Sequence, residues 1–379
     1  MTPADLSRTV VRAVRCAVED GELPVDAVVP ERVVVERTRP GGVGEYATPV
    51  AFQVARSARR APGEVAAVLA RRLEVSDGIE RVEITGAGFL NFVLRKRSVA
   101  DLVREIHAQG IRYGCAPDSD QEQDQDQDHG QGLAVVPAPR TELRARIVRD
   151  VLLRIAATQT VEPAPSAPSS PNIAPVPAGE GDVVARFGVD GAAWAMLAVA
   201  PHESPVFTER LLAQDESNEF FRVRYAHSRA RALTRNAALL GFESAAGEAP
   251  AETVHTVHTD ALHADTVPAD AVHAEALHAD TVHADALHAD TRHADTLLRV
   301  LGEHPLALEA AAHHRAPERL VRQLVELADA LLDFQYRVLP QGDEKPSAAH
   351  RSRLALAEAA GTVLAGGLTL LGMDAPERL

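Results

Sequence analysis

The sequence predicts two structural classes in one chain: an α+β unit at the N-terminus and an all-α helical bundle towards the C-terminus. Three observations support this division. Strand-like patterns are concentrated in roughly the first hundred residues. Leucines at alternating spacings of four and three dominate the last part of the chain. Long stretches rich in Gln, Pro, His and Asp lie between them, and these lack the apolar residues that a folded core requires.

The N-terminal part, residues 1–97, is expected to form a compact α+β unit. Apolar residues at helical spacing begin near Leu6, and one of the later helical patterns opens with a proline, which suits the first turn of a helix. The segment RVEITGAGFLNFVL alternates apolar and polar residues on both sides of a glycine-rich bend. The expected elements are a first helix, a strand at 33–35, helices at 50–60 and 62–73, and a hairpin over 81–94.

Residues 98–185 combine helical patterns with two low-complexity linkers. A helix is expected to end at Gly110, and a strand followed by a helix is expected over 133–157. The acidic Gln/Asp repeat at 117–130 cannot bury enough apolar surface to fold. The Pro/Ala/Ser-rich stretch at 159–182 is typical of an extended linker. We therefore expect both linkers to be disordered.

The formal net charge of −15 argues at first against a nucleic-acid partner. The acids, however, gather in segments 117–130, 159–182 and 243–296, which hold 20 of the 54 acidic residues and one arginine. The rest of the chain carries 38 basic and 34 acidic residues. Nearly all basic residues are arginines, which bind phosphate through two donors and stack on bases, although a GC-rich genome would also enrich arginine.

The stretch SNEFFRVRYAHSRARALTRNA, residues 217–237, predicts a helix with many arginines. One face carries Phe221, Tyr225 and Leu233 with alanines between them. The other faces carry the arginines. Arg224, Arg231 and Arg235 form one stripe together with Ser228, and Arg222 and Arg229 lie beside this stripe. Such a helix repels itself unless an anion approaches it. The alternative is a solvated face of a bundle helix.

Residues 251–296 repeat a five-residue unit of the type ALHAD. A metal site would need histidines that converge on one ion. Five residues advance a helix by about 140° beyond a full turn and alternate sides of a strand, so neither form aligns the histidines. We therefore expect a disordered insert at 243–296 within a helical domain spanning 186–379, and no metal site beyond weak adventitious binding of nickel or zinc.

The C-terminal part gives the clearest helical signal. Leu320, Leu324, Leu327 and Leu331 lie at the spacing of a bundle helix, and a second apolar pattern covers 354–371. Two cysteines a hundred residues apart make neither a disulfide framework nor a zinc site. No signal peptide and no run of about eighteen apolar residues is present, so we expect a cytoplasmic protein without a membrane partner.

Several segments resemble arginyl-tRNA synthetases. FFRVRYAHSRARALTRNA is similar to the segment that opens their DALR anticodon-binding domain, and the C-terminal LGMDAPERL is similar to the end of that domain. The resemblance implies that the helical bundle binds tRNA, and specifically tRNA-Arg. The residues it implies as tRNA contacts are Arg222, Arg224, Tyr225, His227, Arg229, Arg231, Arg235, Arg319, Tyr336 and Arg351.

The N-terminal unit resembles the additional domain of the same family. The match includes GEYAT at 44–48 and GFLN at 88–91. In that family the domain grips the elbow of the tRNA at the D-loop. The residues that the resemblance implies as D-loop contacts are Tyr46, Thr48, Phe52 and Gln53. Pro49 stands where the family has asparagine, which removes an amide able to read a base.

No H-x-G-H motif occurs in the chain, and only Lys96 and Lys345 are lysines, so a KMSKS-like loop is also missing. Between Arg97 and Val183 there are 85 residues, whereas a nucleotide-binding Rossmann core needs on the order of 150. Residues 98–185 resemble an eroded remnant of the core. We therefore expect no catalytic residue and no cofactor; ATP would be needed only by a ligase.

Two other functions stay open. One is an arginine–tRNA ligase or aminoacyl-tRNA-dependent activity that works with a partner supplying the catalytic core. The other is a protein–protein adaptor that binds a synthetase or another enzyme that uses aminoacyl-tRNA, in which the bundle no longer contacts RNA.

Overall fold

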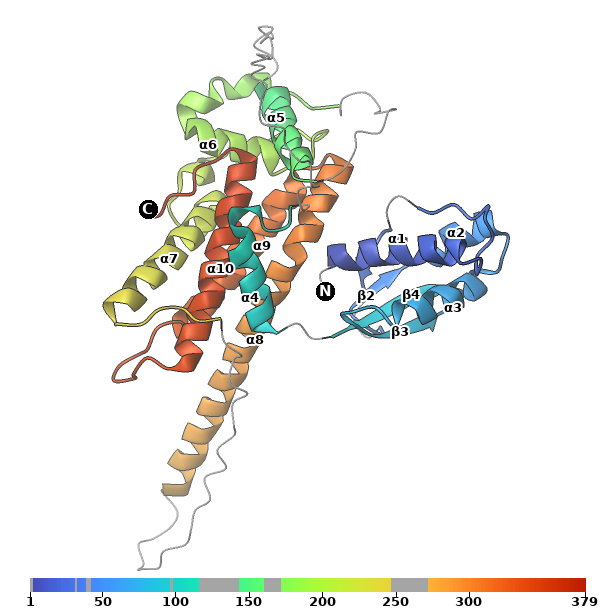
Figure 1. The fold of residues 1–379 in the computed structure, drawn as a ribbon. Helices are drawn as coiled ribbons and strands as arrows, with labels where there is room; N and C mark the ends of the chain where they lie inside the picture. Colours follow the sequence, from blue (N-terminus) through green and yellow to red (C-terminus); the bar gives the residue numbers. More distant parts are fainter. Residues whose placement is uncertain are drawn as a thin grey trace, which may run out of the picture. The chain divides into compact units, whose positions relative to one another are not determined.

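The computed structural model describes residues 3–30, 33–38, 42–95, 98–115, 143–159, 172–246 and 272–379. The chain divides into two compact units, Met1–Ser98 (unit 1) and Val99–Leu379 (unit 2). Unit 1 contains a small antiparallel sheet with helices, and unit 2 is helical (Figure 1). The predicted α+β and all-α character of the two ends is therefore confirmed.

Unit 1 is built on a four-stranded antiparallel sheet with the order β1-β2-β4-β3. Its strands are β1 (Glu36–Arg37), β2 (Tyr46–Thr48), β3 (Ile79–Thr85) and β4 (Phe89–Leu94). The predicted hairpin is confirmed: β3 and β4 pair from Thr85 opposite Phe89 outward. Gly44 precedes β2 at φ 73°, and a Cβ there would lie 2.4 Å from the carbonyl oxygen of Phe92, so only glycine fits.

Three helices accompany the sheet: α1 (Pro3–Glu19), α2 (Val50–Ala58) and α3 (Pro62–Leu73). The core between them contains Leu6, Leu69 and Phe92, which are fully buried. The predicted strand at 33–35 does not form a ladder. Instead side-chain hydroxyls bond its carbonyls: Ser7 Oγ donates to the carbonyl of Val33 at 2.7 Å, and Thr48 Oγ1 donates to that of Val34 at 2.7 Å.

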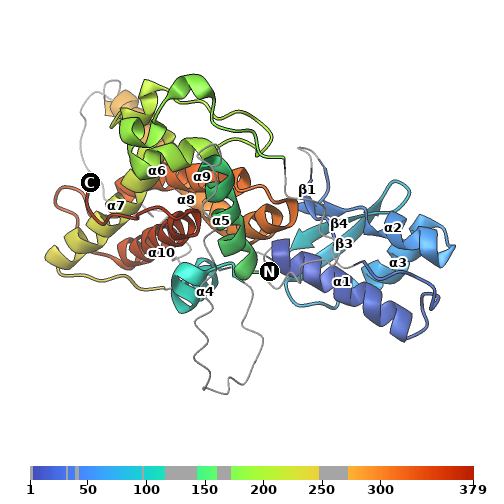
Figure 2. The ribbon, with the colours of Figure 1, turned by 90° about the horizontal axis from the view of Figure 1, so that it is seen from above.

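Unit 2 is organised around the apolar helix α10 (Ala348–Leu371). The helices in contact with it are α4 (Val99–Gln109), α5 (Leu143–Ala157), α7 (Glu219–Leu239), α8 (Val272–His314) and α9 (Glu318–Phe334), while α6 (Val183–Leu197) packs on α5 and α9. The view from above shows α10 enclosed by α4, α7 and α9 (Figure 2). Short 3₁₀ turns lie at η1 (Gly110–Arg112), η3 (Ala178–Glu180), η4 (Glu209–Leu212) and η5 (Gln335–Arg337).

Glycines on α10 allow the neighbouring helices to approach closely. A Cβ on Gly361 would lie 2.7 Å from the Cβ of Ala230 on α7, and a Cβ on Gly367 would lie 2.4 Å from a methyl group of Leu324 on α9. The predicted apolar stripe of α9 is confirmed as core, since Leu320, Leu324 and their partners are fully buried. Among the described residues α10 is also long and apolar enough to span a membrane, but 72% of its most apolar 18-residue stretch is buried inside the fold, as in a core helix.

The histidine-rich segment differs in part from the expectation. Residues 272–296 form the first part of α8 instead of a structureless stretch. They contain no glycine or proline, and alanine and leucine favour the helix. Residues 247–271, the linker residues 117–130 and 160–171, and the expected strand at 133–136 lie outside the described residues.

The three-part division at 97 and 185 stays a prediction. In the structure residues 99–115 and 143–159, which that division separates from the bundle, belong to unit 2. The helices α4 and α5 that they form both contact α10.

Candidate nucleic-acid interface

Helix α7 carries most of the arginines singled out from the sequence, and its start is fixed by Asn218. The Asn218 side chain accepts hydrogen bonds from the backbone N–H groups of Phe220 and Phe221 at 3.1 and 3.3 Å. Its amide donates to the carbonyls of Leu211 and Ala213. This N-cap satisfies helix-end donors and ties α7 to the preceding loop.

The side of α7 that packs on the core differs from the one the sequence suggested. Phe220, Val223, Ala230 and Leu233 are buried, whereas Tyr225 is 40% exposed. The buried side is selected by Ala230, which meets Gly361 of α10. Phe221 and Tyr225 are stacked on each other, with ring centroids 5.8 Å apart and planes 12° apart. An aromatic platform therefore lies at the surface of α7.

The arginines of α7 lie on two flanks of the helix: Arg231 and Arg235 lie with Ser228 beside Glu377, and Arg222 and Arg229 lie beside α9. At about 100° per residue, Arg229 and Arg231 point about 160° apart. On the flank facing α9, Arg222 Nε lies 2.9 Å from Asp329 Oδ1, and Arg229 Nε donates to Gln335 Oε1 at 2.6 Å. Burial raises the pKa of Asp329 and Arg222 opposes that shift. Tyr336, the residue after Gln335, is 69% exposed.

The other flank is covered by the segment that follows α10. Arg231 Nη2 donates to Glu377 Oε1 at 2.6 Å, which holds the pKa of Glu377 below its ordinary value. The carbonyl of Glu377 accepts from Ser228 Oγ at 3.2 Å and from Arg235 Nη2 at 3.4 Å. Arg224 lies over the ring of Phe220. The anions that approach these arginines are in part supplied by the fold itself, through Asp329 beside Arg222 and Glu377 beside Arg231.

His227 does not reach the surface. It is 5% exposed, and its Nδ1 lies 3.0 Å from the carbonyl oxygen of Gly361. Burial lowers its pKa, so the neutral ring is favoured. The sequence placed His227 among the RNA contacts because a helix surface cannot be told from a helix core by residue type alone. The structure makes it a packing residue between α7 and α10.

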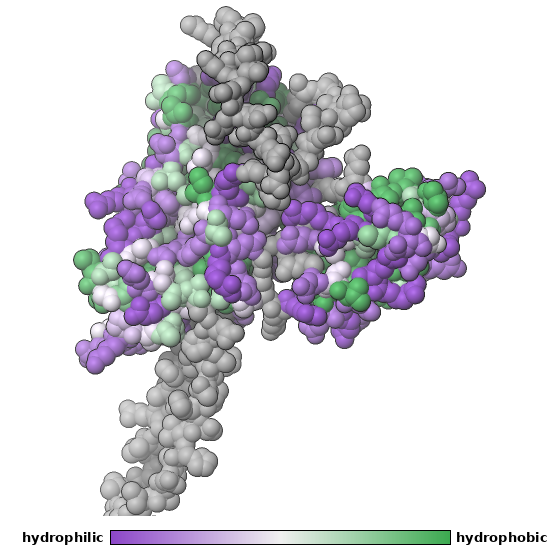
Figure 3. Space-filling view, viewed as in Figure 1, coloured by the Kyte–Doolittle hydropathy of each residue, from purple (hydrophilic) through white to green (hydrophobic). Residues whose placement is uncertain are grey.

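Arg319 and Arg351 lie apart from the aromatic platform. Arg319 is exposed in the first turn of α9, about 25 Å along the helix from Tyr336. Arg351 Nη1 donates to the carbonyl of Glu243, and its guanidinium lies over the ring of Phe242. The structure therefore places Arg222 and Arg229 against α9 and η5, with Tyr336 next in the chain to the acceptor of Arg229, and leaves Arg319 and Arg351 elsewhere on unit 2. Near Phe242 the exposed Leu239 and Leu240 end α7, where Figure 3 shows an apolar patch.

In unit 1 two of the four expected contacts are buried. Tyr46 is 9% exposed and Thr48 is fully buried in β2, so neither reaches a ligand at the surface. Phe52 and Gln53 of α2 are accessible. Phe52 meets Phe89 edge to face with centroids 5.1 Å apart, and Phe89 is 45% exposed. Phe89 is the first residue of β4, and the three residues after it are buried.

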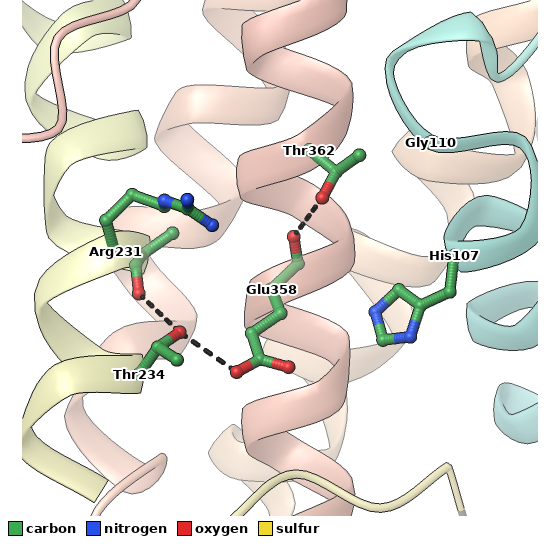
Figure 4. A pocket seen from close by; sticks show the side chains of 7 residues that line it. His107, Gly110, Arg231, Thr234, Glu358 and Thr362 are labelled. Carbon is green, nitrogen blue, oxygen red and sulfur yellow. Dashed lines mark hydrogen bonds between the residues drawn. The ribbon is translucent and has the colours of Figure 1, made fainter. Parts of the chain in front are cut away.

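A pocket that the sequence did not predict lies on the α10 side of α7 (Figure 4). It has a volume of about 330 Å³. Its lining residues are His107, Gly110, Ala230, Arg231, Thr234, Glu358 and Thr362. Within the described ranges, no group of three His, Cys, Asp or Glu side chains is placed to hold a metal ion.

Two family models match the chain. The arginyl tRNA synthetase N terminal domain matches residues 6–94, and the DALR anticodon binding domain matches residues 264–379. The arginine–tRNA ligase of Frankia alni is 49% identical over 116 residues, which are 31% of this chain and 21% of that protein. The chain thus spans about a fifth of the length of that relative.

A structural similarity is weaker. The solved arginyl-tRNA synthetase of Thermus thermophilus aligns over 100% of both chains with 13% identity and a TM-score of 0.48, too low to establish a common fold. The sequence matches carry the relationship instead, since both domain types occur and occur in succession. The chain is an arginyl-tRNA synthetase-related protein.

Proposed function

We propose that the chain binds tRNA-Arg in the cytoplasm and does not aminoacylate it. The observation that carries this proposal is the presence of an anticodon-binding domain and a synthetase N-terminal domain in one chain. The arginine–tRNA ligase of Frankia alni supports arginine as the amino acid of the tRNA.

In unit 2 the aromatic platform is the proposed site for unstacked anticodon bases. Phe221 and Tyr225 offer a stacked surface, and Tyr336 is an exposed aromatic on η5. Bases of single-stranded RNA stack on such rings irrespective of sequence. Arg222 and Arg229 would contact phosphates next to the stacked bases, each keeping or exchanging its present acceptor.

The remaining arginines have secondary roles in this proposal. Arg224, Arg231 and Arg235 lie on the flank beside the C-terminal segment, where Glu377 competes with phosphate for Arg231. A contact by Arg319 or Arg351 would need RNA that extends along the bundle. His227 is excluded by its burial.

In unit 1 the pair Phe52–Phe89 is the proposed contact with the elbow of the tRNA. The edge-to-face pair leaves the Phe89 ring half exposed, and the accessible Gln53 amide lies on the same helix as Phe52. The amide can donate to and accept from a base edge, while the rings stack. Tyr46 and Thr48 support this surface from below and are not part of it.

The absence of catalysis is proposed from the sequence. The chain has no H-x-G-H motif to hold ATP phosphates. Exchange of labelled pyrophosphate into ATP in the presence of arginine, with and without tRNA, tests it. Exchange above background by the purified protein would instead establish a ligase of the arginine–tRNA class.

The RNA proposal itself is tested by filter binding. The protein is titrated against a tRNA-Arg transcript and against a duplex DNA of equal length at several salt concentrations. We expect preference for the tRNA and an affinity that falls with salt, because arginine–phosphate contacts release counterions. Equal affinity for both nucleic acids would overturn the proposal.

One observation favours a second function, that of a protein–protein adaptor. Arg222, Arg229 and Arg231 already have acceptors within the fold, so they can be purely structural. Charge reversal at Arg224 and Arg231 separates the two functions. An adaptor still binds its partner synthetase after these changes and has no RNA affinity before or after them. A tRNA-binding protein binds RNA before the changes and more weakly after them.

A further inference from the structure

The pocket between α4, α7 and α10 is separate from the aromatic platform. At about 100° per residue, Thr234 in its wall points about 140° away from Arg229. Ala230, which packs against Gly361 of α10, lines the pocket. The turn at Gly110, which has φ 58°, ends α4, and His107 in the last turn of that helix faces the pocket from the opposite wall (Figure 4).

One carboxylate is fixed inside this pocket. Glu358 Oε1 accepts a hydrogen bond from Thr234 Oγ1 at 2.9 Å. The other oxygen, Oε2, has no hydrogen-bond partner among the described residues. Thr362 Oγ1 donates to the backbone carbonyl of Glu358 at 3.0 Å, so the lone pairs of the Thr362 hydroxyl can still accept a hydrogen bond. The pocket thus presents acceptors inside and a cation, Arg231, at its wall.

This arrangement selects a planar group with two adjacent N–H donors. A carboxylate accepts two parallel hydrogen bonds from such a group, and the Watson–Crick edge of guanine offers N1–H and N2–H side by side. The imidazole of His107 is exposed and can stack on a base. Arg231 can take the attached phosphate in exchange for Glu377. A volume of about 330 Å³ is that of a single-ligand site at the small end of the usual range.

We propose that the pocket lined by Glu358, Thr234 and His107 binds one unpaired guanine nucleotide. As a subsite for the bound RNA this inference rests on the proposed function. The same chemistry could come from a free guanine nucleotide, so the experiment includes both sources.

The test uses U-rich nonanucleotide RNAs that differ only in the central base, which is guanine, inosine, adenine or uracil. Inosine keeps N1–H and lacks the 2-amino group. We expect guanine to bind about tenfold more tightly than uracil, since one bidentate base contact discriminates by about 1–3 kcal/mol, with inosine in between. Fluorescence anisotropy measures the affinities, and a titration with free GMP is run in parallel.

Two variants and two matched controls locate the site. Glu358→Gln keeps the acceptor for Thr234 and removes the carboxylate, and we expect it to lose the preference for guanine. His107→Ala removes an exposed ring, so the fold is not at risk, and we expect weaker binding of every base at this site. Glu326→Gln and His202→Ala change exposed residues elsewhere on unit 2 and should change nothing.

The outcomes separate this inference from the proposed function. Preference for guanine that Glu358→Gln abolishes supports the site. Binding of tRNA together with equal affinity for all four oligonucleotides overturns the guanine site and leaves the proposed function standing. If the protein binds no RNA, the proposed function fails. GMP binding that depends on Glu358 then supports a nucleotide site, and its absence overturns one.

Discussion

The two units hold their buried polar groups in different ways. Unit 1 buries hydroxyl and amide groups: Ser7 and Thr48 donate to backbone carbonyls, and Asn91 Nδ2 donates to Thr85 Oγ1 at 2.7 Å. No histidine occurs in residues 1–98. Unit 2 buries groups that can carry a charge, including Arg144, His304 and His227. Because two of these groups are histidines, we expect the stability of the helical unit to depend more on pH than that of the α+β unit.

The proposed contact surfaces of the two units also differ in charge. The proposed RNA contact of unit 1 is an aromatic pair, Phe52 and Phe89. That of unit 2 combines aromatic rings with arginines that the fold already pairs, such as Arg222 with Asp329. In the proposed function, contact with RNA at unit 1 adds stacking and hydrogen bonds of the Gln53 amide, whereas at unit 2 it also replaces existing ion pairs.

The largest expected effect concerns Arg144. The five N–H groups of its guanidinium lie within hydrogen-bond distance of six backbone carbonyls, which belong to Ala174, Met196, Val199, Ala200, Pro201 and Glu203. Arg144→Met leaves these acceptors without their donor, and we expect unit 2 to lose more than about 3 kcal/mol of unfolding free energy, because bonds to charged groups are strong and buried acceptors need partners. Urea denaturation followed by the fluorescence of the buried Trp194 measures this.

Arg146→Met on the same helix is the control, because Arg146 is exposed. In unit 1 Thr48→Val removes two neutral hydrogen bonds, to the carbonyl of Val34 and from the N–H of Val50, and should cost about 1–2 kcal/mol, measured by hydrogen exchange in β4. A loss at Arg144 no larger than that at Thr48 would erase the difference between the two units.

The second prediction is a pH dependence confined to unit 2. Burial lowers the pKa of His304 from 6.5 to about 4. A histidine whose folded pKa lies below its unfolded one stabilises the fold fully above pH 6.5, and this contribution is lost as the pH falls towards 4. The loss should reach about 3 kcal/mol by pH 4, again measured by urea denaturation through Trp194. Lowered pKa values of His227 and His350 act in the same direction.

His304→Gln should flatten most of this dependence, although it also removes the hydrogen bond to Gln323 and so lowers stability at neutral pH. Protection of β4 amides in unit 1, corrected for the intrinsic exchange rate, should change far less over the same range. An equal loss in β4 would contradict the comparison.

The third prediction compares the two aromatic surfaces. Tyr225→Ala and Phe89→Ala should each weaken binding of the tRNA-Arg transcript by about 1–3 kcal/mol if a base stacks on each ring. Because both rings are partly exposed, little stability should be lost. Leu239→Ala changes an exposed apolar residue away from both rings and serves as the control in the same filter-binding assay. A loss at only one of the two positions would assign tRNA contact to that unit alone.

The smallest expected effect comes from the Arg231–Glu377 pair. Both side chains are largely exposed, at 49% and 60%, so solvent screens the pair and Glu377→Gln should leave the stability almost unchanged. The variant frees Arg231 for phosphate and should raise tRNA affinity a few-fold, most clearly at low salt. Unchanged affinity would show that Arg231 stays out of contact with RNA. Glu326→Gln is the matched control.

Much of the fold follows from local sequence signals. The hairpin around Gly86–Gly88 and the start of α3 at Pro62 depend on residues with restricted or unusual backbone freedom, which act wherever they occur. The leucine spacing of α9 likewise reports a helix with one apolar side. The relationship to arginyl-tRNA synthetases was also legible in the sequence, through motifs at both ends.

The residues of the candidate sites could be predicted less well from the sequence, because they depend on which side of each helix or strand is covered by its neighbours. His227, Tyr46 and Thr48 have the polar character of contact residues, yet neighbouring elements bury all three. Phe89 was not among the expected contacts and is half exposed. Glu358 gave no signal, since its pocket is made by residues of α4, α7 and α10 that are far apart in the chain.

The sequence by itself determined the kinds of elements, the arginine-rich helix and the family, because turn residues, apolar spacing and motifs are local properties. Only the tertiary structure decided that Asp329, Gln335 and Glu377 would meet the arginines of α7. These partners lie about 100 or more residues away along the chain. Charge patterning within one helix cannot reveal them, since pairing at that separation is set by how helices pack.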